Sequence, residues 1–261
     1  MAFLELHYHS DTLRKAVTVN VILPEKAKTL IGMETDGNSI QSYKTLYLLH
    51  GLSDDHTIWM RRTSIERYAN DRGIAVVMPS VDRSWYTDTA DGARYFTFVT
   101  EELPNVCRSY FRGMSDKRED NMIAGLSMGG YGAIKAALLC PERFGGCASL
   151  SGALNIARLR GLSELAEWRG IFGFDLESTT DLKDSEHDLF AIARAHVAAG
   201  KPLPKLFMWC GTEDSRVGAN RDFTALLDEL HVPHLYKESE GNHHWQWWDL
   251  HIVDALDHLL G

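Results

Sequence analysis

The hydrophobic pattern of the chain alternates between two periods. Short and almost continuous apolar runs predict strands that are buried on both faces. Such runs lie at 45–49, 74–78, 121–124, 147–150, 205–210 and 234–237. Two earlier segments, 4–9 and 15–23, alternate apolar and polar residues and predict a pair of strands joined by a polar turn.

Helical spacing of apolar residues fills most of the intervals between these runs. Helices are expected at 62–72, 96–111, 131–140, 189–199, 219–230 and 245–260. Pro104 lies inside the second of them and predicts a kink or a break there. Strands that alternate with helices predict one α/β domain over 1–261, with a mostly parallel central sheet flanked by helices on both faces.

Three segments follow neither period. Residues 24–42 contain glycines and an asparagine and predict a loop or a hairpin tip, and residues 80–95 are polar, aromatic and irregular. The longest irregular segment, 153–185, combines scattered glycines and acids. Because a long irregular stretch in an α/β chain is usually functional, we expect a small lid-like insertion there.

The most informative stretch is Gly125-Leu-Ser-Met-Gly-Gly130, which turns an expected strand into an expected helix. This Gly-x-Ser-x-Gly turn is typical of the nucleophile elbow in the α/β-hydrolase fold, and a plain Gly/Ser turn is the alternative. Ser127 must take a strained conformation at the tip, and the flanking glycines let strand and helix pack closely. The helix N-terminus also favours negative charge beside the hydroxyl. Ser127 is therefore the predicted nucleophile.

A serine hydroxyl is a weak nucleophile that needs a base, and in this fold an acid and then a histidine follow the serine along the chain. The strand at 205–210 leads directly into Gly211-Thr-Glu-Asp214. Asp214 is therefore the predicted acid, and Glu213 is the alternative on the same loop. Acids further along lie in an expected helix, where solvated surface charge is the favoured interpretation.

The turn ahead of the last helix carries the predicted base. His243 and His244 both lie on it, and two adjacent side chains cannot both point at the serine. We prefer His243, because His244 is closer to the first helical residue, where it would pack or cap. A second pair, His7 and His9, has no third ligand nearby, so no metal site is expected.

An oxyanion hole requires two backbone N–H groups aimed at the same oxygen. One is expected from Met128, the residue after the nucleophile. The other is expected from the loop His50-Gly-Leu52, which follows the strand at 45–49. Because Gly51 lets the backbone approach the substrate, we assign the donor to Leu52, with Gly51 as the second choice.

Composition and charge exclude several classes of function. With 44% hydrophobic and 24% charged residues, the 261-residue chain is typical of a globular protein. Its net charge of −9 disfavours binding to nucleic acid or to an anionic membrane, and neither partner is expected. The first ten residues do not have the pattern of a signal peptide. The four cysteines lack Cys-x-x-Cys spacing and predict buried free thiols, so a cytoplasmic location is expected.

With these motifs the chain resembles the esterase D family of α/β-hydrolases, most closely its cytoplasmic tributyrin-esterase branch. The resemblance covers nearly the whole chain and rests on four stretches that follow the family order. These are Leu48-Leu-His-Gly-Leu52, Gly125-Leu-Ser-Met-Gly-Gly130, Cys210-Gly-Thr-Glu-Asp214 and Gly241-Asn-His-His-Trp245. The family's Gly-x-His-x-Trp pattern falls on His243. Trp85 and Tyr86 lie in a stretch that resembles a family segment near the pocket, and with Tyr131 they are the expected substrate contacts.

The resemblance implies a serine carboxylesterase that hydrolyses small-molecule short-chain acyl esters through an acyl-enzyme, without a cofactor or a metal. An S-formylglutathione hydrolase-type thioesterase is the main alternative. That branch favours Gly-His after Gly-Gly and an Asp-His-Ser run around its catalytic base. This chain instead has Tyr131 after Gly-Gly and His243-His-Trp245 around the predicted base. An acyltransferase and a non-catalytic binding protein with the same fold are further alternatives. Acyl length and oligomeric state, a homo-oligomer included, stay open.

Overall fold

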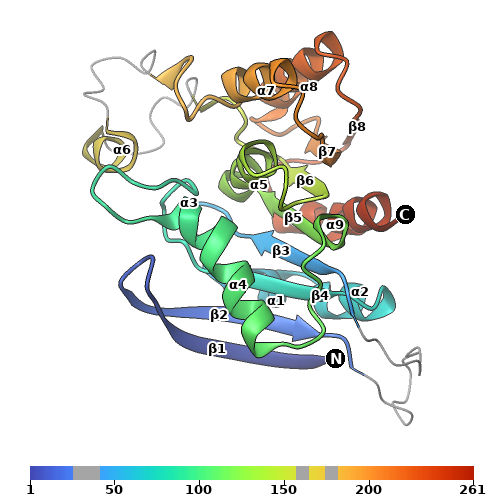
Figure 1. Ribbon diagram of the computed structural model, residues 1–261. Helices are drawn as coiled ribbons and strands as arrows, with labels where there is room; N and C mark the ends of the chain where they lie inside the picture. Colours follow the sequence, from blue (N-terminus) through green and yellow to red (C-terminus); the bar gives the residue numbers. More distant parts are fainter. Residues whose placement is uncertain (26–41, 157–164, 174–181) are drawn as a thin grey trace.

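A computed structural model describes residues 1–25, 42–156, 165–173 and 182–261, and Figure 1 shows its arrangement. In these residues eight strands form one sheet, in the order β1-β2-β4-β3-β5-β6-β7-β8. The strands are β1 (Ala2–Ser10), β2 (Lys15–Leu23), β3 (Thr45–Leu49), β4 (Ala75–Pro79), β5 (Asn121–Leu126), β6 (Gly146–Leu150), β7 (Lys205–Gly211) and β8 (Leu235–Ser239). Neighbouring strands pair parallel from β4 to β8 in this order, whereas β1 with β2 and β2 with β4 pair antiparallel at one margin. The predicted α/β-hydrolase sheet is confirmed.

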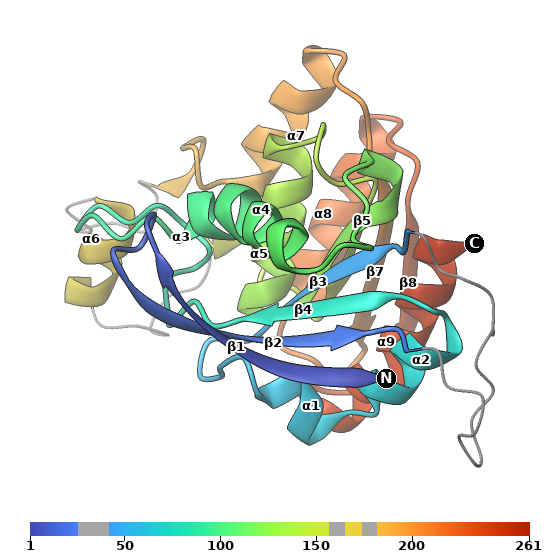
Figure 2. The ribbon, with the colours of Figure 1, turned by 60° about the horizontal axis from the view of Figure 1, so that its bottom comes forward.

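Helices cover both faces of this sheet, as predicted. The helices are α1 (Ile58–Arg62), α2 (Ile65–Asp71), α3 (Tyr95–Thr97), α4 (Leu103–Tyr110), α5 (Met128–Leu139), α6 (Leu165–Phe172), α7 (Leu189–Ala198), α8 (Val217–Glu229) and α9 (Trp245–Leu260). Figure 2 shows α4, α5, α7 and α8 on one side of the sheet and α1, α2 and α9 on the other. Successive side chains of β3 point to opposite faces of the sheet. Tyr47 and Leu49 belong to the hydrophobic core on one face, and Leu46 and Leu48 belong to the core on the other face.

The helix expected at 62–72 is two short helices, α1 and α2. Thr63 between them is extended, with φ −137° and ψ 172°. The Ser64 N–H donates to the Asp249 carboxylate of α9 at 2.9 Å, and the Tyr68 hydroxyl donates to the same oxygen at 3.1 Å. A carboxylate more than 180 residues away therefore anchors the start of α2.

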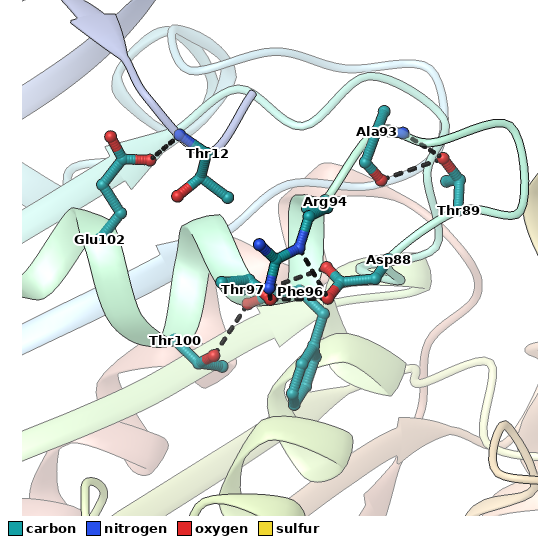
Figure 3. Close-up of polar contacts among 9 residues, drawn as sticks. All are labelled: Thr12, Asp88, Thr89, Ala93, Arg94, Phe96, Thr97, Thr100 and Glu102. Atoms are coloured by element: carbon teal, nitrogen blue, oxygen red, sulfur yellow. Dashed lines mark hydrogen bonds and ion pairs between the residues drawn. The ribbon is translucent and has the colours of Figure 1, made fainter. Parts of the chain in front are cut away.

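The segment Tyr95–Tyr110 is helical throughout, with a π-helical turn at Phe98–Glu102 between α3 and α4. Pro104 has no N–H and would crowd the preceding turn, and the wider turn just ahead of it accommodates the ring without a break. Figure 3 shows how the start of this helix is held: the N–H and the hydroxyl of Thr97 donate to the Asp88 carboxylate at 2.9 and 2.6 Å. The expected break at Pro104 therefore does not occur, and a kink there stays a prediction.

The described part of the expected insertion at 153–185 contains α6. Residues 157–164 and 174–181 of that insertion lie outside the described ranges, as do residues 26–41 of the expected loop at 24–42. Helix α6 is joined to the segment after β4, because the N–H groups of Ala90 and Asp91 donate to Ile171 O and Gly170 O at 3.1 and 3.0 Å. Movement of this insertion as a lid stays a prediction.

The four cysteines are free and buried, as predicted. Burial raises the pKa of the Cys107 thiol to about 12, which leaves it an apolar core residue at neutral pH. Within the ranges described, none of the helices is both long enough and apolar enough to pass through a bilayer.

Candidate active site

Ser127 lies at the carboxyl edge of the sheet, between the end of β5 and the first residue of α5. Its φ of 52° and ψ of −115° form the strained turn that the sequence predicts. Backbone hydrogen bonds on both sides hold this conformation: the Ser127 N–H donates to Leu150 O at 3.0 Å, and the Ser127 carbonyl accepts from Ala153 N at 3.0 Å. The end of β6 and the residues after it therefore hold Ser127 from both sides.

Two glycines make this sharp turn sterically possible. A Cβ on Gly125 would lie 2.5 Å from the backbone of Gly129, and a Cβ on Gly129 would lie 2.5 Å from Leu49 O. Real Cβ atoms do not approach backbone atoms so closely, so β3, β5 and α5 meet at a distance that only glycine permits. Ser127 is held at that junction.

His243 and Asp214 form a continuous hydrogen-bonded path to the Ser127 hydroxyl. His243 Nε2 is 3.0 Å from Ser127 Oγ, and His243 Nδ1 is 2.8 Å from Asp214 Oδ2. Because a carboxylate only accepts, Nδ1 carries the hydrogen and Nε2 is left to accept from the serine hydroxyl. The alternatives point elsewhere: His244 is exposed at the start of α9, and Glu213 is exposed on its loop.

Asp214 is 2% exposed at the end of β7, and its charge is compensated by donors. Burial alone would raise the pKa of its carboxyl group. Hydrogen bonds from His243, the Arg216 N–H at 2.8 Å and the Ser151 side chain outweigh burial, and together they lower the pKa of Asp214 below its ordinary value. The carboxylate is therefore ionised at neutral pH, as an acid that orients a histidine must be.

The loop after β3 lies next to the serine. A Cβ on Gly51 would lie 2.9 Å from Leu126 and 3.9 Å from Ser127 Cβ, so the loop packs directly against the elbow. In the part of the chain that is described, neither the Leu52 N–H nor the Met128 N–H donates to a protein acceptor. Two unused donors beside a serine are suited to binding an oxyanion.

His50, predicted only as part of this loop, supports the loop from within. Its imidazole is buried; Nε2 accepts from the Val81 N–H at 3.0 Å, and Nδ1 lies 2.7 Å from Gly51 O. Since Val81 N–H is a donor, Nδ1 carries the hydrogen and donates to Gly51 O. Burial lowers the pKa of His50, which keeps this tautomer neutral. The signal in the sequence that could have singled out His50 is its place as a polar residue directly after a buried strand.

The three expected substrate contacts are buried side chains. Trp85, Tyr86 and Tyr131 are 2%, 1% and 0% exposed. The Tyr86 hydroxyl donates to His50 O at 3.0 Å, and the Tyr131 hydroxyl donates to His187 O at 2.8 Å. Both phenols therefore hold backbone near the site, and a direct contact of these residues with substrate stays a prediction.

A comparison with protein families and curated proteins finds esterases. The model of the family described as putative esterase matches residues 10–259. Acetyl esterase of Caldicellulosiruptor saccharolyticus is 33% identical over 267 residues, which cover 98% of this chain and 97% of that protein.

Two solved structures from Staphylococcus aureus are similar over the whole chain. The fluorophosphonate-binding serine hydrolase F, with substrate bound, is 37% identical with a TM-score of 0.89 and covers 100% of this chain and 98% of its own. S-formylglutathione hydrolase, as the apoenzyme, is 36% identical with a TM-score of 0.86 and covers 100% of this chain and 99% of its own.

Proposed function

Since the chain belongs to the putative esterase family and is a carboxylic ester hydrolase of the serine type, we propose that Ser127, His243 and Asp214 are its catalytic triad. The observation that carries this proposal is the unbroken path of hydrogen bonds from Asp214 through His243 to Ser127. The path ends at a hydroxyl on a strained turn beside two unused N–H donors. This combination provides a nucleophile, a base and a place for the negative charge.

In the proposed reaction Ser127 Oγ attacks the ester carbonyl while His243 Nε2 takes the serine proton. The carbonyl oxygen becomes an oxyanion, which the N–H groups of Leu52 and Met128 bind. The intermediate collapses, and the departing alkoxide receives the proton from His243 and leaves as the alcohol. Water then attacks the acyl-enzyme by the same route, with His243 as the base, and releases the carboxylic acid.

Replacement of the nucleophile tests the proposal directly. We expect Ser127→Ala to lose hydrolysis of p-nitrophenyl acetate by on the order of a millionfold in kcat. A fluorophosphonate probe should label the wild type and leave the variant unlabelled, because only an activated serine reacts. Turnover by purified, folded Ser127→Ala at the wild-type rate would contradict the assignment.

Short acyl esters are the proposed substrates. The support is the acetyl esterase with which the chain shares 33% identity, together with the resemblance to the tributyrin-esterase branch of the esterase D family. A series of p-nitrophenyl esters from acetate to decanoate tests this proposal. We expect kcat/KM to be highest for acetate to butyrate, and a maximum at decanoate would contradict it.

A thioesterase acting on S-formylglutathione is the second candidate. The S-formylglutathione hydrolase structure at 36% identity favours it, whereas Tyr131 and the run His243-His-Trp245 depart from the pattern of that branch. The two candidates share one triad, so the ratio of kcat/KM for S-formylglutathione to that for p-nitrophenyl butyrate distinguishes them. We expect the ester to be the better substrate.

A further inference from the structure

The imidazole of His50 contacts backbone on both of its sides. His50 is buried and directly follows β3. Its Nε2 accepts from the Val81 N–H at 3.0 Å, so the single hydrogen of the neutral ring lies on Nδ1. Nδ1 donates that hydrogen to Gly51 O, 2.7 Å away. The ring therefore joins the segment after β4 to the carbonyl of the next residue in the loop His50-Gly-Leu52.

The Gly51 carbonyl accepts a second hydrogen bond. The Asp54 N–H donates to the same oxygen at 3.2 Å, which closes a four-residue turn from Gly51 to Asp54. Leu52 is the second residue of this turn. With a donor from the imidazole and another from the turn, Gly51 O is held in one direction, and the planar peptide bond between Gly51 and Leu52 is held with it.

The Leu52 N–H belongs to this same peptide bond. The described residues contain no cis peptide bond, and in a trans peptide the carbonyl and the following N–H point in opposite directions. The Leu52 N–H therefore points away from His50 and Asp54, and no protein acceptor takes it among the described residues. Gly51 lies beside the nucleophile, because a Cβ there would be 3.9 Å from Ser127 Cβ. The imidazole thus sets the direction of the N–H that is expected to bind the oxyanion.

His50 is itself held by the segment after β4. The Tyr86 hydroxyl donates to His50 O at 3.0 Å, and the Val81 N–H donates to the ring. Tyr86 is packed so tightly against α5 that a Cβ on Gly132 would lie 2.4 Å from its ring. Burial lowers the pKa of His50, which keeps Nε2 free of a proton and able to accept. The loop is therefore organised before any substrate binds.

We propose that His50 is a positioning residue of the esterase, an inference that rests on the proposed triad and its oxyanion hole. The hydrogen bond from His50 Nδ1 to Gly51 O holds the Leu52 N–H toward the oxygen on which negative charge develops. The imidazole does not touch the ester, because it is buried and both of its nitrogens contact backbone. Its effect belongs to the transition state, where that charge forms.

Removal of the imidazole is the first test. We expect His50→Ala to lower kcat and kcat/KM on p-nitrophenyl acetate equally, by roughly thirtyfold per titrated active site, because an interaction of the transition state is weakened. His196→Ala on α7 is the matched control. His196 is equally buried, and its ring contacts Leu138 O at 2.7 Å and Pro202 O at 3.1 Å. Because Leu138 lies at the end of α5 remote from Ser127, its rates should stay within about twofold of wild type, whatever the loss of Tm.

Two amide variants separate the two hydrogen bonds of the ring. His50→Asn places an N–H near the position of Nδ1, where it can donate to Gly51 O, and we expect rates within about threefold of wild type. His50→Gln places its amide near the position of Nε2, where it can accept from Val81 but does not hold Gly51 O. We expect it to lose roughly thirtyfold. If His50→Ala does not fold, the difference between these two variants carries the test.

A double-mutant cycle tests whether His50 acts through the Leu52 N–H. Proline is favoured at the second position of a turn and has no N–H, so Leu52→Pro removes the donor without opposing the turn. We expect it to lower kcat by about a hundredfold to a thousandfold. Adding His50→Ala to Leu52→Pro should then lower kcat by less than about threefold more, because the N–H that His50 orients is already absent.

The outcomes distinguish this inference from the proposed function. The positioning role would be overturned by wild-type rates in His50→Ala or Leu52→Pro, or by equal rates in His50→Asn and His50→Gln. A full thirtyfold effect of His50→Ala in the Leu52→Pro background would overturn it as well. In each case the triad stands if Ser127→Ala is inactive. Wild-type activity of Ser127→Ala would overturn the triad itself, and the positioning role with it.

Discussion

At the scale of single residues, the tautomer of each imidazole near Ser127 is decided by a neighbour that can only donate or only accept a hydrogen bond. Asp214 can only accept, so His243 Nδ1 donates to it and Nε2 faces Ser127. The Val81 N–H can only donate, so His50 is protonated on Nδ1 and holds Gly51 O. One histidine thereby contacts the serine hydroxyl, and the other contacts the loop that packs against Ser127.

Adjacent histidines on the turn ahead of α9 give a matched test at this scale. We expect His243→Ala to lower kcat on p-nitrophenyl butyrate by on the order of a millionfold, because Ser127 then has no base. His244→Ala should stay within about threefold of wild type, since that side chain is exposed at the start of the helix. Steady-state kinetics of both variants check this. A larger loss of kcat in His244→Ala than in His243→Ala would make His244 the base instead.

At the scale of elements, the site depends on three segments that approach each other more closely than side chains allow. The carbonyls of Leu49 and His50 lie against Gly129 in the first turn of α5, and Gly129 lies against Gly125 of β5. Because α5 starts directly after Ser127, its first N–H groups point toward the nucleophile. The sequence placed the start of this helix three residues later, since Met128, Gly129 and Gly130 are poor evidence for a helix by propensity alone.

Two helical glycines test the role of this close approach. Gly129→Ala should reduce the free energy of unfolding by about 3 kcal/mol or more, because its Cβ would lie 2.5 Å from Leu49 O. Gly218→Ala in α8 meets nothing within 4 Å and should add about 0.5 kcal/mol through the higher helix propensity of alanine. Thermal unfolding measures both changes, and a drop in Tm of about 6–12 °C is expected for the first. Equal Tm values for the two variants would contradict this account.

At the scale of the whole molecule, a buried lysine joins three distant segments behind the site. Lys135 of α5 is 4% exposed; its ammonium donates to the Thr87 hydroxyl at 2.8 Å and lies 3.5 Å from His187 Nδ1. The rings of Phe96 and Tyr131 complete its surroundings, with centroids 5.3 and 5.6 Å away. Burial lowers the pKa of Lys135 to about 7, although the acids Glu186 and Asp88 oppose that shift.

The stability of the protein should therefore depend on pH through Lys135. The pKa of a lysine is near 10.5 in the unfolded chain and about 7 here, so the unfolded state binds more protons between these values. Stability contributed by this site is present above pH 10.5 and is lost as the pH falls to 7. We expect Lys135→Met to raise Tm above that of wild type, and to do so more at pH 6.5 than at pH 9.

An exposed lysine provides the control for this pH dependence. Lys201→Met should differ from the wild type by the same amount at both pH values, because Lys201 is exposed in the folded protein. Thr87 keeps a partner in the Lys135→Met variant, since its hydroxyl also donates to Trp85 O at 3.0 Å. A Tm difference for Lys135→Met that is independent of pH would show that burial of the charge does not limit stability.

The fold was predictable because its signals are local. A buried strand and an amphipathic helix each show their period within about ten residues, and their alternation indicates a covered parallel sheet. The prediction of one helix at 62–72 was wrong because a distant contact intervenes. Asp249 of α9 holds the start of α2, and this contact is not visible in a window of neighbouring residues.

The sequence by itself determined which serine is the candidate nucleophile, because the Gly-x-Ser-x-Gly turn needs only the strand before it and the helix after it. It also narrowed the acid and the base to two residues each. Burial of Asp214 and exposure of Glu213, like the orientation of His243, were decided by tertiary structure. The reason is sequence separation: His243 reaches Ser127 across 116 residues, and Trp248 reaches Ser151 across 97. Only the packing of α9 against the sheet brings such donors and acceptors to 3.0 Å, so the hydrogen-bond path of the candidate site became visible in the fold alone.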